Sequence, residues 1–275
     1  MAIKLIVMDM DGTLLDDDHA TVPVRNVTAL RAAREKGIKL ALASGRTWSI
    51  LQDAVEQLGG LDYAILANGA AIREVSSGEH IYENSFPNAQ ARALIRALER
   101  EDLPFEIYCH GRNYLRPKDV DRLGEGLLSP QFAKVYLKRG VELAPDLTEA
   151  LAGRSMEKIN LFYAPPERQE HLRAIAMATG PVEISKALAR NMEFNFGGAS
   201  KGAALTALAA HLGFGPEEVM AFGDANNDLT MLRWAYWSFA MDNAMPEAKA
   251  AARYHTASNH EAGVGQAVEK YVLGK

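Results

Sequence analysis

The sequence predicts an α/β fold in which an inserted α+β domain interrupts a parallel sheet. Three observations predict it: apolar strand segments alternate with helical patterns early in the chain, this alternation is lost in the middle, and it returns near the end. Strands that alternate with helices are typical of parallel sheets with crossover helices. We therefore expect residues 1–83 and 188–275 to form one core and residues 84–187 to form the insertion.

The first part of the chain contains three apolar runs of strand length separated by helical spacing. Pro23 can begin a helix, because its missing N–H is not needed there, and Gly37 can end it. We expect strands at residues 3–8, 39–43 and 63–67, and helices from Pro23 and over residues 48–58.

The middle of the chain has few strand–helix–strand units. A Ser76-Ser77-Gly78 turn separates two short segments that are typical of antiparallel strands. In this region we expect strands at residues 71–75, 80–83, 105–110, 113–116, 156–163 and 182–186, and helices over residues 88–101 and 166–179. In the last part we expect strands at residues 219–222, 239–241 and 253–256, and helices after Lys201 and over residues 229–234 and 261–273.

Composition excludes several classes of protein. The chain has 275 residues, 48% of them apolar, and its 30 Lys and Arg against 35 Asp and Glu give a net charge of −5. This balance argues against general binding of nucleic acid, which needs a basic surface. Cys109 is the only cysteine, so an intrachain disulfide is impossible, as is typical of a reducing compartment. No apolar run approaches the roughly 18 residues of a membrane span, so we expect a cytoplasmic protein with no membrane partner.

Asp9-Met10-Asp11-Gly12-Thr13 directly follows the first expected strand. Two carboxylates at positions i and i+2 can bind a hard cation and still offer an oxygen to a substrate. An acidic turn that caps a helix is the ordinary alternative. The position after a buried strand favours the functional interpretation, because open α/β sheets bind ligands at the carboxyl ends of their strands.

Two further motifs are suited to an anion. Ser44-Gly45-Arg46 follows the second expected strand, where a hydroxyl and backbone N–H groups can face a phosphate, although a simple turn has the same composition. Ser200-Lys201-Gly202 begins a helix. A lysine does not stabilise this end of a helix, so it indicates a nearby anion, with an exposed surface lysine as the alternative.

The fourth motif is Gly223-Asp224-Ala225-Asn226-Asn227-Asp228, after a short expected strand. Its two carboxylates and two carboxamides can bind magnesium directly or through water. An Asp/Asn turn that caps the next helix is the alternative, but capping does not need all four side chains.

In this order and at these positions, the motifs resemble those of the haloacid dehalogenase-like (HAD) hydrolase superfamily, specifically the Cof-type phosphatases with a type II (IIB) cap. The stretches Met241-Asp242-Asn243-Ala244 and Glu261-Ala262-Gly263-Val264 are also similar to that subgroup, except that glycine usually stands at the place of Asp242. The resemblance covers nearly the whole chain. It implies a Rossmann-like parallel-sheet HAD core at residues 1–83 and 188–275, and an α+β cap at residues 84–187 that selects the substrate.

The resemblance implies a magnesium-dependent phosphatase that acts on small phosphorylated metabolites, with sugar phosphates as the first expectation. Asp9 would be the nucleophile that forms an aspartyl-phosphate, and Asp11 the general acid and base. The implied magnesium ligands are Asp9, the backbone carbonyl of Asp11, Asp224 and, through water, Asp228. The implied phosphate-binding groups are Ser44, Lys201, Asn227 and the backbone N–H groups of Met10 and Gly45.

Two other functions share these features. A sugar phosphomutase has the same fold and nucleophile, and a phosphorylatable signalling domain also uses aspartates, magnesium, a hydroxyl and a lysine at strand ends. Asp11 favours hydrolysis, because transport ATPases of the superfamily, which preserve their aspartyl-phosphate, have threonine at this place. In the cap, each polar candidate for contact with the leaving group is more often an ordinary strand or turn residue than a contact residue. These candidates are His110, Arg112, Tyr114 and Lys158. Cys109 is expected to be buried.

Overall fold

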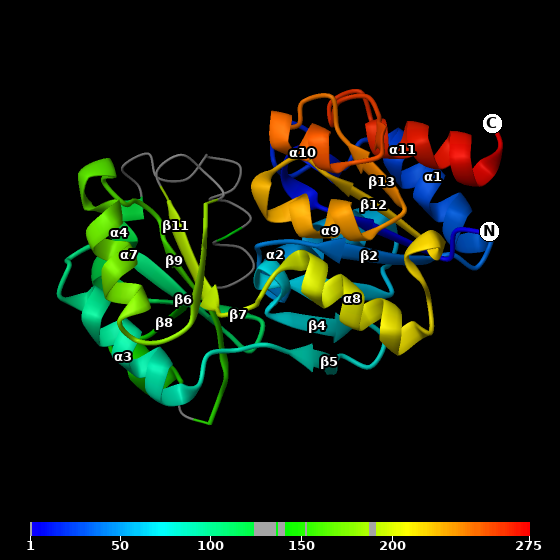
Figure 1. Ribbon diagram of the computed structural model, residues 1–275. Coiled ribbons are helices and arrows are strands. Elements are labelled where there is room, and N and C mark those ends of the chain that lie inside the picture. The colour runs from blue at the N-terminus through cyan, green and yellow to red at the C-terminus, as the bar shows by residue number, and fades with distance from the viewer. Residues whose placement is uncertain (1, 124–135, 137–140, 152, 187–190) are drawn as a thin grey trace. The chain divides into compact units, whose positions relative to one another are not determined.

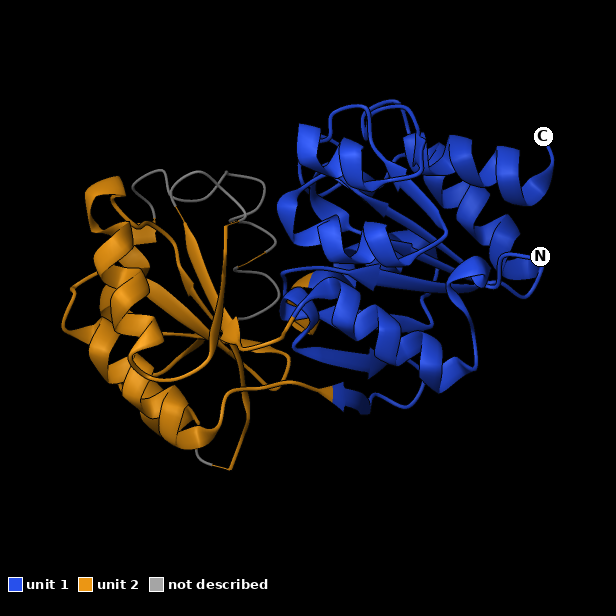
Figure 2. Ribbon diagram, in the orientation of Figure 1, with its two compact units in different colours: residues 1–46, 51–82, 200–275 blue, residues 47–50, 83–199 orange. Residues whose placement is uncertain are grey.

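The computed structural model describes residues 2–123, 136, 141–151, 153–186 and 191–275, and the chain divides into two compact units (Figure 2). Unit 1 combines Met1–Arg46, Leu51–Tyr82 and Ser200–Lys275. Unit 2 combines Thr47–Ile50 and Glu83–Ala199. The two ends of the chain thus lie in the same unit.

Unit 1 is built on an eight-stranded sheet in the order β14-β13-β12-β1-β2-β3-β4-β5 (Figure 1). The strands from β14 to β3 are parallel, and β4 is antiparallel to β3. The strands are β1 (Leu5–Met8), β2 (Lys39–Ala43), β3 (Tyr63–Leu66), β4 (Ala71–Glu74), β5 (His80–Glu83), β12 (Val219–Gly223), β13 (Trp237–Ala240) and β14 (Tyr254–His255).

Helices accompany this sheet, and the core of unit 1 lies between them and the strands. Leu205 and Leu208 of α8 and Met231 of α9 pack against Val7 and Val219 on one face of the sheet. On the other side α1 contacts β2 and packs against α11 (Figure 1). The helices are α1 (Val24–Glu35), α2 (Trp48–Leu58), α8 (Lys201–Leu212), α9 (Leu229–Trp234), α10 (Pro246–Ala251) and α11 (Gly263–Val268). The start of α2, up to Ile50, is grouped with unit 2.

Unit 2 has a six-stranded sheet in the order β10-β11-β9-β6-β7-β8, antiparallel except between β7 and β8. Leu94 and Leu98 of α3 and Leu172 of α7 pack with Ile107 and Ile159 on one face. The strands are β6 (Phe105–Cys109), β7 (Arg112–Leu115), β8 (Val141–Leu143), β9 (Met156–Leu161), β10 (Val182–Ser185) and β11 (Met192–Phe196). The helices are α3 (Asn88–Glu99), α4 (Pro117–Leu123), α6 (Leu147–Ala150) and α7 (Gln169–Met177).

The predicted fold class, a parallel-sheet α/β core with an inserted α+β region, is confirmed. Residues 187 and 188, where we placed the return to the core, lie outside the described residues. Strand β11 follows them and pairs with β9 and β10, so the chain stays in unit 2 through Ala199. Among the strands and α-helices of the described residues, five were not predicted, namely β8, β11, α4, α6 and α10. Four of them are too short to show a clear period, whereas β11 has the alternation Met-Glu-Phe-Asn-Phe that indicates a strand.

Asn26 joins distant parts of unit 1. It is buried in α1, its Nδ2 donates to the carbonyl of Leu14 at 3.2 Å, and its Oδ1 accepts from the N–H of Gly265 in α11 at 2.7 Å.

We expect Asn26→Ala to lower the free energy of unfolding by about 2 to 4 kcal/mol, because two buried backbone groups lose their partners. Urea unfolding measures this. Thr28→Ala, on the exposed side of α1, is the matched control, and equal stability of the two variants would contradict the prediction.

Candidate active site

The predicted site residues follow neighbouring strands at the centre of the unit 1 sheet. Asp9 follows β1, Ser44 follows β2 and Asp224 follows β12. From β1 the chain adds β2 and β3 on one side, whereas β12, β13 and β14 lie on the other. Ligands of open α/β sheets bind where the strand order reverses in this way, at the carboxyl ends.

Lys201 connects two of these segments. Its Nζ donates to Oδ1 of Asp9 at 2.6 Å and to Oδ1 of Asp228 at 2.7 Å, and all three residues are buried. Lys201 is the first residue of α8, and the Ser200 hydroxyl accepts from the N–H of Ala203 to cap this helix. The two carboxylates therefore explain why a lysine is tolerated at the positive end of a helix dipole.

Asp228 also shapes the loop after β12. Its Oδ2 accepts from the backbone N–H groups of Asp224 at 2.9 Å and Ala225 at 3.0 Å. Asp224 in turn accepts a hydrogen bond of 2.7 Å from the buried hydroxyl of Thr13. The backbone of Gly12, at φ +75°, comes so close that a Cβ there would lie 2.5 Å from Oδ2 of Asp224. Only glycine fits at this position.

Oxygen atoms of Asp9, Asp224 and Asp228 all lie within 4.8 Å of one another. Burial and the charge of Asp228 raise the pKa of Asp9 well above its usual value. Burial, with Asp228 again adding to it, raises the pKa of Asp224 to about 6. Burial alone would lower the pKa of Lys201, but the Asp228 and Asp9 carboxylates raise it above its usual value. Three carboxylates thus face one ammonium, and their hard oxygen atoms fit an additional divalent cation such as Mg²⁺.

Asp11 lies in a different environment from Asp9. The Arg46 guanidinium donates to both of its oxygens, at 2.9 Å from Nε and 2.5 Å from Nη2, and Nδ1 of His19 lies 3.0 Å from Oδ1. Burial would raise the pKa of Asp11, but Arg46 and His19 together hold it well below its usual range. Two aspartates two residues apart therefore have pKa values shifted in opposite directions, as occurs at catalytic sites.

The other predicted phosphate-binding groups lie at the same strand ends. Met10 follows Asp9, and Ser44 is buried with its Oγ accepting from the N–H of Arg46 at 3.2 Å. Gly45 stands between Ser44 and Arg46. Nδ2 of Asn227 donates to Oδ1 of Asn68, after β3, at 3.4 Å.

A family model described as haloacid dehalogenase-like hydrolase matches residues 6–268. The chain belongs to the haloacid dehalogenase-like hydrolases. The predicted resemblance and enzyme class, a phosphatase of this superfamily, are confirmed. The match includes every predicted site residue and extends over both units.

Two relatives and a solved structure match this hydrolase over nearly their full length. A putative phosphatase of Bacillus subtilis, YxeH, is 32% identical over 280 residues, which cover 99% of each chain. A 5-amino-6-(5-phospho-D-ribitylamino)uracil phosphatase of the same organism, YcsE, is 29% identical, with 98% of this chain and 96% of the relative covered. The solved structure of a haloacid dehalogenase-like hydrolase from B. subtilis superposes with a TM-score of 0.86 at 27% identity, covering 98% of this chain and all of that one.

The structure adds residues that the sequence analysis assigned no role. Thr13 and Arg46 stand inside predicted motifs, but the carboxylates they contact, those of Asp224 and Asp11, lie 211 and 35 residues away in the sequence. Asn68 stands outside them, and it and Ala67 both have left-handed backbones, at φ 60° and 49°. Asn68 N–H donates to the carbonyl of Ser44, and Ala67 N–H donates to that of Arg46. Strained backbone is common at functional sites, and the Asn-Gly dipeptide after β3 was the available signal.

The polar candidates of unit 2 have different surroundings. Lys158 is buried, with its Nζ 2.8 Å from Oε1 of Glu193. Tyr114 lies in the core beneath the helices, whereas Arg112 is exposed and pairs with Glu142 at 2.6 Å. His110 is exposed in the turn after β6. Cys109 is buried as predicted, and burial raises the pKa of its thiol to about 12.

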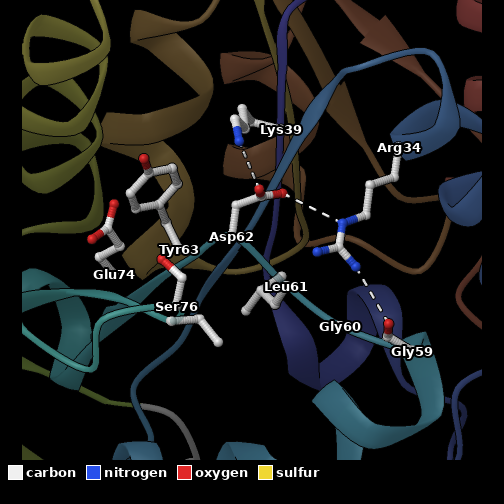
Figure 3. A pocket seen from close by; sticks show the side chains of 10 residues that line it. Arg34, Lys39, Gly59, Gly60, Leu61, Asp62, Tyr63, Glu74 and Ser76 are labelled. Carbon is white, nitrogen blue, oxygen red and sulfur yellow. Dashed lines mark hydrogen bonds and ion pairs between the residues drawn. The ribbon is translucent and has the colours of Figure 1, made fainter.

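A cavity of about 330 Å³ lies away from these strand ends, next to the start of β2 and β3 (Figure 3). Its charged groups are paired internally: Nζ of Lys39 lies 2.9 Å from Asp62, and Nε of Arg34 lies 3.8 Å from the other Asp62 oxygen. Glu74 also lines the cavity, so its two cations face two carboxylates and leave no net positive charge to attract a phosphate. No predicted site residue lines it, and it is therefore not the candidate active site. Among the described residues, no helix combines the length and apolar character needed to cross a membrane.

Thr13 tests the cation-binding interpretation of the carboxylate cluster. We expect Thr13→Val to weaken Mg²⁺ binding about 10-fold, because Asp224 loses the hydrogen bond that orients it. Isothermal titration calorimetry with MgCl₂ measures the affinity. Thr13→Ser keeps the hydroxyl and should bind Mg²⁺ like the unmodified protein. Equal affinity of the valine variant would show that this hydrogen bond does not orient a cation ligand.

Proposed function

We propose that this hydrolase is a cytoplasmic, magnesium-dependent phosphatase that acts on small phosphorylated metabolites, with sugar phosphates tested first, through an aspartyl-phosphate. The contrast between Asp9 and Asp11 is the observation that carries the proposal. Asp9 is buried beside Lys201 and two other carboxylates, whereas Asp11, two residues later, is more exposed and paired with Arg46. We assign nucleophilic attack to Asp9, which lies among the groups proposed to hold the cation, and proton transfer to Asp11, which is more open to solvent.

In the first step, a carboxylate oxygen of Asp9 attacks phosphorus in line and forms an O–P bond. The bond between phosphorus and the ester oxygen breaks, and Asp11 gives its proton to that oxygen, which leaves as an alcohol. Lys201 keeps Asp9 in place during attack through the hydrogen bond to Oδ1.

In the second step, water attacks the phosphorus of the aspartyl-phosphate. Asp11 accepts a proton from this water, the bond between phosphorus and Asp9 breaks, and inorganic phosphate is released. Asp11 is then protonated again, ready for the next ester. The groups proposed to hold the phosphoryl oxygens in both steps are Ser44, Lys201, Asn227 and the backbone N–H groups of Met10 and Gly45.

Asp9, Asp224 and the backbone carbonyl of Asp11 would hold Mg²⁺ directly, and Asp228 would hold it through water. Bound there, the ion supplies positive charge that reduces the repulsion between the Asp9 carboxylate and a phosphate dianion. The proximity of the three carboxylates and the raised pKa values of Asp9 and Asp224 support this assignment.

We also propose that unit 1 is the catalytic core and unit 2 the cap that selects the leaving group. The names of relatives suggest compounds to test. They include the 5-amino-6-(5-phospho-D-ribitylamino)uracil phosphatase described above and an HMP-PP phosphatase of Klebsiella pneumoniae that is 28% identical and matches 90% of this chain. Phosphorylated precursors of cofactors therefore belong in the test beside sugar phosphates.

We expect release of many equivalents of phosphate from at least one class in a panel of sugar phosphates, nucleotides and cofactor precursors, with Mg²⁺ present. Asp9→Asn should abolish release, because the amide is a poor nucleophile. The assay measures inorganic phosphate and, for each sugar, an isomerised phosphosugar with and without a bisphosphate activator. Isomerisation would indicate a phosphomutase instead, and a single phosphorylation without turnover would indicate a signalling domain.

A second variant separates proton transfer from binding of the cation. We expect Asp11→Asn to lose roughly 10²- to 10⁴-fold in turnover, the usual contribution of general acid and base catalysis. Mg²⁺ affinity should be nearly unchanged, because the proposed ligand from this residue is its backbone carbonyl. Calorimetry and steady-state kinetics measure the two properties separately. Turnover close to that of the unmodified enzyme would exclude Asp11 as the acid and base.

A further inference from the structure

Arg46 contacts Asp11 at two points. Its Nε donates to Oδ2 at 2.9 Å and its Nη2 donates to Oδ1 at 2.5 Å. Two hydrogen bonds from one planar guanidinium fix both the position and the plane of a carboxylate, which a single hydrogen bond does not. The contact therefore sets the direction in which Asp11 presents its oxygen atoms.

The backbone and side chain of Arg46 are both well held. Its N–H donates to Oγ of Ser44 at 3.2 Å, and its carbonyl accepts from the N–H of Ala67 at 3.0 Å. The exposed fraction of the Arg46 side chain is 9%, against 42% for Asp11. A fixed, buried guanidinium thus orients a carboxylate that is more open to solvent.

His19 completes the arrangement from a third direction. Its ring Nδ1 lies 3.0 Å from Oδ1 of Asp11, and its carbonyl accepts from Nη2 of Arg46 at 3.3 Å. Its backbone is left-handed, at φ 56°, a conformation that few residues with a Cβ adopt. This unusual backbone conformation brings the His19 ring to Asp11 and the His19 carbonyl to Arg46.

We infer that Arg46 is a positioning residue that orients Asp11 toward the ester oxygen and, later, toward the attacking water. The inference rests on the proposed function, in which Asp11 donates a proton in the first step and accepts one in the second. It makes a specific distinction: without Arg46, proton transfer becomes slow, while the residues proposed to bind the cation and the phosphoryl oxygens remain in place.

Leaving groups of different basicity test this distinction in Arg46→Gln. p-Nitrophenolate leaves without needing a proton, whereas an alkoxide must be protonated as it leaves. In the first turnover, measured by rapid quench with Mg²⁺ present, we expect an alkyl phosphate to react roughly 10- to 100-fold more slowly with Arg46→Gln than with the unmodified enzyme. p-Nitrophenyl phosphate should react within about 3-fold of the unmodified enzyme and give a burst of p-nitrophenol, followed by slow hydrolysis of the aspartyl-phosphate.

Two further variants control for charge and folding. Arg46→Lys keeps the charge but cannot donate from a planar fork, so it should recover only part of the alkyl phosphate rate. Arg25→Gln removes an arginine of the same unit that pairs with Glu269 at 2.6 Å, and should leave all rates unchanged. Asp11 retains solvent and His19 as partners in Arg46→Gln. We therefore expect the midpoint of thermal unfolding and the Mg²⁺ affinity to stay close to those of the unmodified protein.

The outcomes separate the inference from the proposed function. Equal slowing of both esters in the first turnover would overturn the inference, because Arg46 would then act on the phosphoryl group or on the fold. Unchanged rates with both esters would overturn it too, while selective slowing in Asp11→Asn would leave the proposed function standing. If the unmodified enzyme turned over neither ester nor any compound of the metabolite panel, the proposed function itself would fail, and the inference with it.

Discussion

The buried ammonium of Lys201 is the interaction on which the site depends. Burying a charge costs free energy unless the charge is paired and hydrogen-bonded. Removing one partner of such a pair therefore leaves an uncompensated buried charge. Lys201 neutralises part of the charge on Asp9 and Asp228 at 2.6 and 2.7 Å. It thereby joins the end of β1 to the start of α8 and the turn after β12, so the site exists only when the two ends of the chain fold together.

The charges near Asp9 and Asp11 are arranged in opposite ways. With the chain's own charges, the pKa of Asp9 is raised because burial and Asp228 disfavour its ionised form, and the pKa of Asp11 is lowered by Arg46 and His19. The proposed roles need the reverse, an ionised nucleophile and a protonated acid. A divalent cation bound at the cluster would lower the pKa of Asp9, because it would favour the ionised carboxylate. A phosphate dianion bound next to Asp11 would be a like charge and would raise the pKa of Asp11. The cation would thus correct the pKa of Asp9, and the substrate that of Asp11.

The sequence predicted the sheet of unit 1 because its strands are short apolar runs bounded by glycine, proline and polar turns, and it predicted the four motifs because they stand at strand ends. It could not predict which atoms pair. The contact between Arg46 and Asp11 spans 35 residues, and the one between Thr13 and Asp224 spans 211. Side-chain pairing over such distances is set by the tertiary structure, whereas the strained backbone at Ala67 and Asn68 opposes local preference.

Glu106 in β6 shows that buried polarity in unit 2 is not by itself a binding site. One of its oxygens accepts from Tyr108 and Asn160, and the other accepts from Asn113 and Tyr136, at 2.6 to 3.2 Å. A carboxylate accepts about four hydrogen bonds, so the capacity of Glu106 is filled by the chain itself. A fully satisfied buried network rigidifies a domain. Glu106 therefore stabilises the sheet of unit 2, and recognition of a leaving group depends on side chains whose hydrogen-bonding capacity is not filled in this way.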